Sequence, residues 1–373
     1  MLAPVQLADF KRQWSSIREP ALAAVDRVGE SGWLILGTEV AAFERDLAGA
    51  CGVAHVVGCA NGLDAIEIAL RAAGIGKGDR VLTTPLSAFA TALAIIRAGA
   101  EPVFVDVDAS GLLDLDLAEQ ALSDDPAIRA VVPVHLFGHA QDLDRLEAMA
   151  TTHGAAVIED CAQAIGARSH GRPVGSVGIA GATSFYPTKN LGALGDGGAV
   201  LTRDAGIAES ARGLRDYGQS AKYVHDRLGL NSRLDELQAA VLRDALLPEL
   251  TAGTARRVAI ADRYRREITT PDLVHPPIPH GSASVWHLFP VLSRGDREAF
   301  RAHLDAHGVG NAVHYPVLMS DQQALREAFP NASHGPLPFA DRFARQEISL
   351  PLHAYLSDDE VERVIAACND WQG

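Results

Sequence analysis

The chain has 373 residues, 47% of them hydrophobic, and a formal net charge of -14 at neutral pH. This length and apolar fraction allow a large core and more than one lobe, while the acidic balance argues against a nucleic-acid partner. The sequence has no apolar run long enough to cross a membrane and no signal-peptide pattern. The four cysteines show no metal or disulfide spacing. We therefore expect a cytoplasmic protein with reduced thiols and no metal site.

Short apolar runs alternate with helical patterns between residues 40 and 245. The runs occupy residues 55–60, 80–85, 101–107, 129–136, 155–160, 182–186 and 198–202. The segments between them, such as 63–75 and 143–154, carry apolar residues at helical spacing and end at glycine. This alternation predicts an α/β fold with a mainly parallel, seven-stranded sheet covered by helices.

The C-terminal third of the chain has a different pattern. A helical stretch at 234–269 leads into a proline-rich connector at 271–281. A strand, a helix and a closing amphipathic helix are then predicted at 285–293, 296–308 and 358–371. We expect a large domain at 20–250, and a smaller α+β domain at 251–373 that also includes the N-terminal segment 1–19.

Lys189 is one of only four lysines among 33 basic residues, and it lies in the glycine-rich segment SFYPTKNLGALGDGGAV at 184–200. A deprotonated lysine amine can attack an aldehyde and form a Schiff base, whereas an arginine guanidinium stays protonated. Glycines in such a loop allow the backbone to approach a ligand closely. Lys189 is therefore a candidate for covalent chemistry, although a solvated lysine in a loop is the simpler alternative.

Asp160 ends the predicted strand AAVIED, and strand ends in α/β sheets are where ligand groups collect. If the cofactor is pyridoxal 5'-phosphate (PLP), an aspartate beside the ring nitrogen keeps that nitrogen protonated. Asp106 ends a comparable strand, but its context VDVDASG is more typical of a turn. We prefer Asp160, for which a helix cap is the alternative interpretation.

An anion site is predicted where a strand, an Asn61-Gly62 turn and a helix beginning near Leu63 follow one another. Ser184 adds a hydroxyl from the lysine loop. Phe89 could cover one face of a cofactor ring, although an aromatic residue at a helix start is as often part of a core. Taken alone, the Asn-Gly turn is a weak signal.

Together these segments resemble the fold type I, PLP-dependent nucleotide-sugar aminotransferases of the DegT/DnrJ/EryC1/StrS family, whose fold is like that of aspartate aminotransferase. The resemblance covers nearly the whole chain. It rests, in the order of the family, on SGWLILGTEVAAFE, CANGLDAIEIAL, VIEDCAQAIG, SFYPTKNLGALGDGGA, NSRLDELQAA, HYP and SLPLH. The motifs are specific as a set, although several would be weak alone.

The resemblance assigns roles in PLP binding. It implies that Lys189 binds PLP covalently and moves protons, that Asp160 contacts the pyridine nitrogen, and that Gln163 lies by the ring hydroxyl. It also implies that Phe89 stacks on the ring. The phosphate would be bound by Gly62, Leu63, Ser184 and by Asn231 of the partner subunit, so that a homodimer shares its two active sites.

The lysine loop and the segment LRDYGQSAKYVH resemble members that aminate C3 of a nucleotide-linked 3-keto-6-deoxyhexose. L-glutamate is the implied amino donor, dTDP the preferred nucleotide, and a 3-amino-3,6-dideoxyhexose the product. The candidate substrate residues are Tyr186 for the hexose, and Lys222, Tyr223, His314 and Tyr315 for the diphosphate.

The chain departs from the family pattern at Leu34, where an aromatic residue is common, and at Thr188, where a glycine is common. Both departures bear on sugar packing and leave the Schiff-base chemistry intact. The alternatives are amination of C4 or of a cyclitol ketone, and a PLP-binding regulatory protein. A dehydratase of the family would replace the lysine, typically with histidine.

Overall fold

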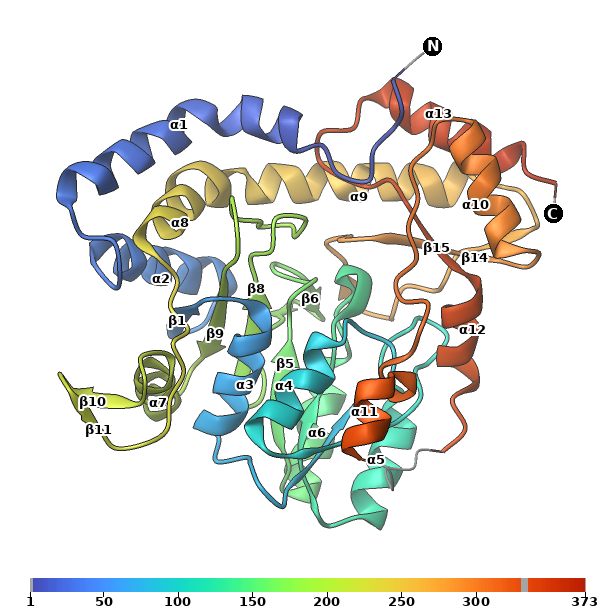
Figure 1. The fold of residues 1–373 in the computed structure, drawn as a ribbon. Helices are drawn as coiled ribbons and strands as arrows, with labels where there is room; N and C mark the ends of the chain where they lie inside the picture. The colour runs from blue at the N-terminus through green and yellow to red at the C-terminus, as the bar shows by residue number, and fades with distance from the viewer. Residues whose placement is uncertain (1–2, 330–334, 373) are drawn as a thin grey trace.

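The computed structural model describes residues 3–329 and 335–372 and is built around a seven-stranded sheet (Figure 1). The order of its strands is β1-β9-β8-β5-β4-β2-β3. The strands are β1 (His55–Cys59), β2 (Arg80–Thr83), β3 (Glu101–Phe104), β4 (Ile128–Val132), β5 (Ala156–Asp160), β8 (Ala180–Ser184) and β9 (Gly198–Thr202). Only β9 runs antiparallel to its neighbours. The predicted mainly parallel α/β sheet is confirmed.

Helices cover both faces of this sheet. They are α2 (Thr38–Cys51), α3 (Gly62–Ala72), α4 (Ala90–Ala98), α5 (Leu115–Asp124), α6 (Leu143–His153) and α7 (Ala205–Arg215), whereas α1 (Phe10–Ser31) packs against α8 (Glu236–Val241). Successive strand residues point to opposite faces, so Val81 packs in the core beneath α3, α4 and α7, whereas Leu82 packs against α5 and α6. Both faces are buried, and the strands are therefore almost wholly apolar.

The predicted helical stretch at 234–269 is not continuous. It divides into α8 (Glu236–Val241), a π-helical turn (Leu242–Leu246), a 3-10 turn (Leu247–Glu249) and α9 (Leu250–Glu267). Pro248 lies in the middle of this change. Because proline has no N–H and its ring clashes with the carbonyl four residues earlier, regular α-helix cannot pass through it. Helix α9 then runs toward the C-terminal elements (Figure 1).

The C-terminal region contains a three-stranded antiparallel sheet in the order β12-β14-β15. Its strands are β12 (Leu273–Val274), β14 (Phe289–Ser293) and β15 (Glu347–Leu350), and its helices are α10 (Arg297–Ala306), α11 (Gln323–Ala328), α12 (Pro338–Gln346) and α13 (Asp358–Asn369). The strand predicted from residue 285 begins only at Phe289. Val5 packs into this core, which is separate from the core around α1 and α8. The domain division at residue 250 remains our proposal, and the separate cores support it.

Several small elements have no counterpart in the sequence prediction. They include a second three-stranded sheet of β6 (Arg168–Ser169), β7 (Arg172–Pro173) and β13 (Ser282–Ala283), the hairpin β10 (Gln219–Ala221) and β11 (Val224–His225), and 3-10 turns at Leu136–Gly138 and Met319–Asp321. The hairpin projects from the body of the protein beside α7 (Figure 1). All four cysteines are buried and free. None of the helices in the described part of the chain has the length and apolarity needed to cross a membrane.

Candidate active site

A cavity of about 420 Å³ opens beyond the carboxyl ends of β5 and β8. Ligand sites in α/β sheets are found at such strand ends. Most of the predicted site residues line this cavity, although they are distant in the sequence. These are Gly62, Leu63, Asp160, Gln163, Ser184, Tyr186, Lys189, His314 and Tyr315.

Lys189 lies on the loop that follows β8. Its backbone N–H donates to the carbonyl of Tyr186 at 2.8 Å, which closes a tight turn. Burial lowers the pKa of the Lys189 amine from 10.5 to about 8, and the negative charge of Asp160 partly opposes this shift. A substantial fraction of the amine is therefore neutral near physiological pH, which is the form that attacks an aldehyde.

Asp160 is buried at the end of β5 and only 4% exposed. Its carboxylate accepts hydrogen bonds from the Thr91 hydroxyl at 2.8 Å and the Ala162 backbone N–H at 3.1 Å. Burial raises the pKa of Asp160, and these two bonds together with Lys189 act against the rise. The Ser87 hydroxyl lies 3.1 Å from that of Thr91 and continues the chain. The carboxylate is thus held in one orientation at the cavity wall.

The N-terminus of α3 forms an anion cradle. The Asn61 side chain caps the helix by accepting from the Asp64 backbone N–H at 2.8 Å, so the amides of Gly62 and Leu63 face the cavity. A side chain on Gly62 would place its Cβ only 2.6 Å from that of Ser184. Only glycine therefore lets the Ser184 hydroxyl stand beside the helix N-terminus, where backbone dipoles favour a phosphate.

Gln163 connects the two sides of the cavity. Its side-chain oxygen accepts from the Phe137 backbone N–H at 2.8 Å, and its nitrogen lies 3.3 Å from the Tyr315 hydroxyl. Burial raises the pKa of Tyr315 well above its ordinary range, so the phenol keeps its proton.

These groups fit PLP. A reactive amine, a carboxylate held deep in the cavity and an amide-rich helix N-terminus match its aldehyde, ring nitrogen and phosphate, respectively. The rival Asp106 is elsewhere, because its carboxylate caps α12 by accepting from the backbone N–H groups of Phe339 and Ala340 at 3.0 and 2.9 Å. The preference for Asp160 over Asp106 agrees with this geometry.

Four predicted site residues do not line the cavity of their own chain as the structure describes it. Phe89 packs beside Phe104, Met319 and Leu325, so its predicted stacking on a cofactor ring gains no support from this arrangement. Asn231, Lys222 and Tyr223 lie on or next to the projecting hairpin, and Lys222 contacts the ring of Tyr223.

Sequence reasoning missed His287, which lines the cavity next to Lys189. Its Nδ1 lies 3.2 Å from the Asn190 side-chain oxygen. Burial, followed by the positive charge of Lys189, lowers the pKa of His287 well below its usual range, so the ring is neutral. A histidine before the strand β14 carries no sequence signal of its own, because the fold alone brings it to the lysine loop.

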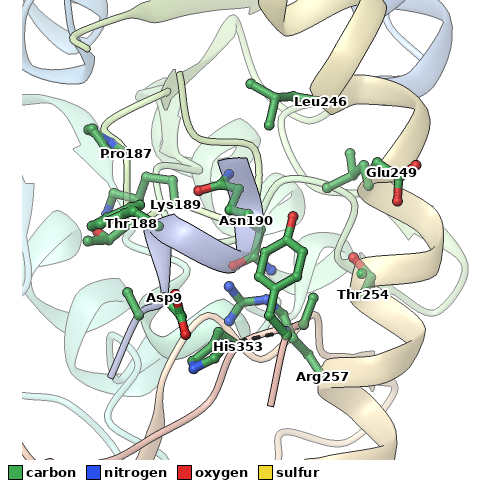
Figure 2. A pocket seen from close by; sticks show the side chains of 17 residues that line it. Asp9, Pro187, Thr188, Lys189, Asn190, Leu246, Glu249, Thr254, Arg257 and His353 are labelled. Carbon is green, nitrogen blue, oxygen red and sulfur yellow. Dashed lines mark hydrogen bonds between the residues drawn. The ribbon is translucent and has the colours of Figure 1, made fainter. Parts of the chain in front are cut away.

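A second, smaller cavity of about 60 Å³ also borders the lysine loop, at Pro187, Thr188, Lys189 and Asn190 (Figure 2). Arg257 of α9 points into it together with His353. The buried guanidinium donates to the carbonyls of Leu352 at 2.7 Å and of Trp286 and His287 at 3.3 Å. Burial lowers the pKa of Arg257 to about 10. Arg257 therefore ties α9 to the segments that carry His287 and His353.

The fold, the lysine and the carboxylate at the strand end define a PLP-dependent transferase. The model of the DegT/DnrJ/EryC1/StrS aminotransferase family matches residues 15–369. The chain belongs to this family of PLP-dependent aminotransferases.

Three known proteins show how close the similarity is. The chain is 42% identical over 369 residues to the dTDP-3-amino-3,4,6-trideoxy-alpha-D-glucose transaminase of Streptomyces venezuelae, covering 98% of this chain and 96% of that protein. The structure of S. venezuelae DesV in complex with a ketimine intermediate superimposes with a TM-score of 0.94, at 42% identity and 99% coverage of both chains. NtdA of Bacillus subtilis with bound cofactor PMP has a TM-score of 0.90 at 27% identity, covering 99% of this chain and 85% of that one.

Proposed function

We propose that this protein transfers the amino group of L-glutamate to C3 of a dTDP-linked 3-keto-6-deoxyhexose and yields a 3-amino-3,6-dideoxyhexose. The observation that carries the proposal is that Lys189 and Asp160 line the same cavity as the anion cradle of α3. The similar protein of S. venezuelae is named for a dTDP-3-amino sugar, which supports both the nucleotide and the position of amination.

Bound PLP would supply an aldehyde that exchanges amino groups and a ring that stabilises negative charge at the neighbouring carbon. Lys189 would hold it and, once released, would move a proton at Nζ between the substrate carbon and the cofactor carbon that shares the nitrogen, in one direction with the donor and in the reverse direction with the sugar. Its pKa of about 8 suits both directions of this transfer. Asp160 would pair with the ring nitrogen, and Gly62, Leu63 and Ser184 would bind the phosphate.

The donor and the ketosugar would use the same cavity in turn, because both must reach Lys189. The reaction is then of the ping-pong type, with 2-oxoglutarate leaving before the sugar enters. Tyr186 stands at the mouth with 53% of its surface exposed, which is where the hexose would pass.

A homodimer with shared sites completes this proposal. Trp33, Leu34, Ile35, Leu194 and Leu237 are exposed apolar residues, and their segments lie together, because Leu34 accepts from the backbone N–H of Glu236 and Leu194 donates to Gln238. Monomeric proteins rarely leave such groups uncovered together. Asn231, Lys222 and Tyr223 do not line the described cavity of their own chain, and in a two-fold dimer they would serve that of the partner subunit.

Mixing two inactive variants tests the shared site. Lys189→Ala and Asn231→Ala chains, unfolded and refolded together, would form hybrid dimers with one fully intact site. Activity should return to about a quarter of the wild-type value, the share of intact sites expected from random pairing. No recovery, with hybrid dimers demonstrated by mass, would contradict a contribution of Asn231 across the interface.

Absorption spectroscopy tests the first half-reaction. Purified protein with PLP should show the visible band of lysine-bound cofactor, and L-glutamate should convert it to the band of pyridoxamine phosphate. Lys189→Ala should show neither change, while Lys77→Ala, which removes an exposed lysine, should behave as wild type. A protein that binds PLP but does not respond to any amino donor would favour the regulatory alternative.

A further inference from the structure

Three polar side chains run from the cavity into the core of the C-terminal region. His314 lines the cavity, and its Nδ1 lies 2.9 Å from the Ser349 hydroxyl. The Ser349 hydroxyl lies 2.6 Å from Oε1 of Glu347. The other oxygen of Glu347 accepts from the backbone N–H of His314 at 2.6 Å. Ser349 and Glu347 are both 0% exposed.

Strand register builds this chain of hydrogen bonds. Glu347 and Ser349 are two residues apart on β15 and so share one face, whereas Ile348 and Leu350 pack into the apolar core. Ala312 pairs antiparallel with Ser349, which sets His314 opposite Glu347. Two polar residues on one face of a fully buried strand are unusual, because each must be matched by a partner.

Glu347 differs from an ordinary buried carboxylate because no cationic side chain of the described residues lies within ion-pair distance of it. The nearest positive group, Arg297, directs its guanidinium to Glu298 and to the Ala344 carbonyl. Burial raises the pKa of Glu347 to about 8, while Ser349, the His314 N–H and Arg297 oppose the rise. Tyr315 is the other titratable group nearby, and Lys189 and His287 face His314.

We propose that Glu347, Ser349 and His314 form a proton relay between the buried carboxyl group and the active-site cavity. With Glu347 ionised, Ser349 donates to Glu347, Nδ1–H of His314 donates to Ser349, and Nε2 offers a lone pair to the cavity. When Nε2 takes a proton from the cavity, the Nδ1 proton passes to Ser349 and the Ser349 proton passes to Glu347. His314 stays neutral, and the proton is stored on Glu347.

The relay gives His314 a defined task in the reaction, and this part of the inference rests on the proposed function. Exchange of a carbonyl oxygen for an amine removes both protons from the nitrogen and releases the oxygen as water. A group that accepts a proton from nitrogen and returns it to oxygen therefore serves each exchange without net gain or loss. His314 would be the catalytic residue, while Ser349 and Glu347 act through it and are positioning residues.

The tautomer of His314 tests the relay directly. In protein labelled with nitrogen-15 at histidine and measured with PLP and without substrate, the His314 signals, assigned from their loss in His314→Gln, should change from the Nε2–H to the Nδ1–H tautomer as the pH rises through about 8. Glu347→Gln can donate to Ser349 and still accept from the His314 N–H. It should hold the Nε2–H tautomer at every pH.

Ser349→Ala should uncouple the tautomer of His314 from pH and lower kcat by about tenfold to a hundredfold with little change in KM. Ser293→Ala is the matched control, since Ser293 is equally buried in the same sheet and its hydroxyl has no partner among the described residues. A His314 tautomer that is the same in wild type and Glu347→Gln at every pH would overturn the relay. A tautomer that switches in a protein that transfers no amino group would leave the relay standing and reject the proposed function.

Discussion

The two walls of the active-site cavity are built in opposite ways. On the large-sheet side, Asp160 and the start of α3 are held by backbone amides and by hydroxyl groups with fixed partners. On the C-terminal side, His287 and His314 are neutral rings, and Glu347 accepts from one backbone N–H and one hydroxyl. The large-sheet side, which we call the first wall, fixes charges. The C-terminal side, the second wall, can redistribute protons.

This difference follows the demands of amino transfer. A cofactor that stays in place throughout a ping-pong cycle needs permanent anchors for its phosphate and ring. Two different substrates that visit the same cavity need donors and acceptors that can exchange roles, and neutral histidines provide both. We therefore expect substitutions in the first wall to abolish chemistry, and those in the second to change its rate and pH dependence.

The largest effect is expected for Lys189→Ala. Loss of the Lys189 amine from the cavity should reduce amino transfer by at least about a thousandfold and remove the visible band of bound PLP. Circular dichroism should show an unchanged fold, because the side chain serves chemistry more than packing. If Lys189→Ala transferred amino groups about as fast as Lys77→Ala, Lys189 would not be the amine that binds PLP.

Arg257→Met tests what holds the second wall in place. The change leaves three buried carbonyls without their charged donor and should lower the free energy of unfolding by about 2–4 kcal/mol. Urea titration measures this. Arg266→Met, on an exposed part of the same helix, should change the value by less than about 0.5 kcal/mol. Equal effects of the two substitutions on the free energy of unfolding would show that Arg257 does not hold these segments against α9.

Thr91→Val tests whether the Thr91 hydroxyl, which belongs to the first wall, is needed to orient Asp160. The hydroxyl orients Asp160, and its loss removes one hydrogen bond to a buried carboxylate, worth about 1.5–3 kcal/mol. Amino transfer should fall by about tenfold to a hundredfold, whereas Thr91→Ser, which keeps the hydroxyl, should stay near wild type. A Thr91→Val enzyme with unchanged kcat would mean that backbone contacts alone position Asp160.

The smallest expected change is a shift in pH dependence. PLP should attach to cofactor-free protein faster as the pH rises through about 8, because only the neutral Lys189 amine reacts. Asp160 raises the pKa of Lys189, so Asp160→Asn should move the midpoint to lower pH. Stopped-flow absorbance gives both curves. A midpoint near 10.5 in wild type would indicate an amine that is not desolvated.

The first wall was largely accessible from sequence because its signals are local. A strand ending in Asp160, an Asn-Gly turn before a helix and a lysine among glycines each occupy a few consecutive residues. Because ligand groups collect at strand ends in α/β sheets, Asp160 could be expected at a ligand site. The resemblance to a family then joined them, and the family, the fold and the cofactor are confirmed.

The second wall was not accessible in this way. His287 precedes β14, and Glu347 and Ser349 lie on β15, so these residues come to the same side of the cavity through the pairing of β14 with β15 and of residue 312 with Ser349. Alternation in EISL could have marked Glu347 and Ser349 as sharing a face, but not which face. Pro248 could have indicated the break in the predicted helix, because proline interrupts regular α-helix. The helical pattern on both sides of Pro248 led instead to the prediction of one continuous helix.

The most direct test of the proposed function is to follow nitrogen from donor to product. With nitrogen-15 L-glutamate and a dTDP-linked 3-keto-6-deoxyhexose, the account predicts a dTDP-sugar with nitrogen-15 bonded to C3, and none with Lys189→Ala. The UDP-linked sugar and the 4-keto isomer are the matched alternatives. Label bonded to C4, or no labelled sugar from any of these substrates while PLP remains bound, would contradict the account.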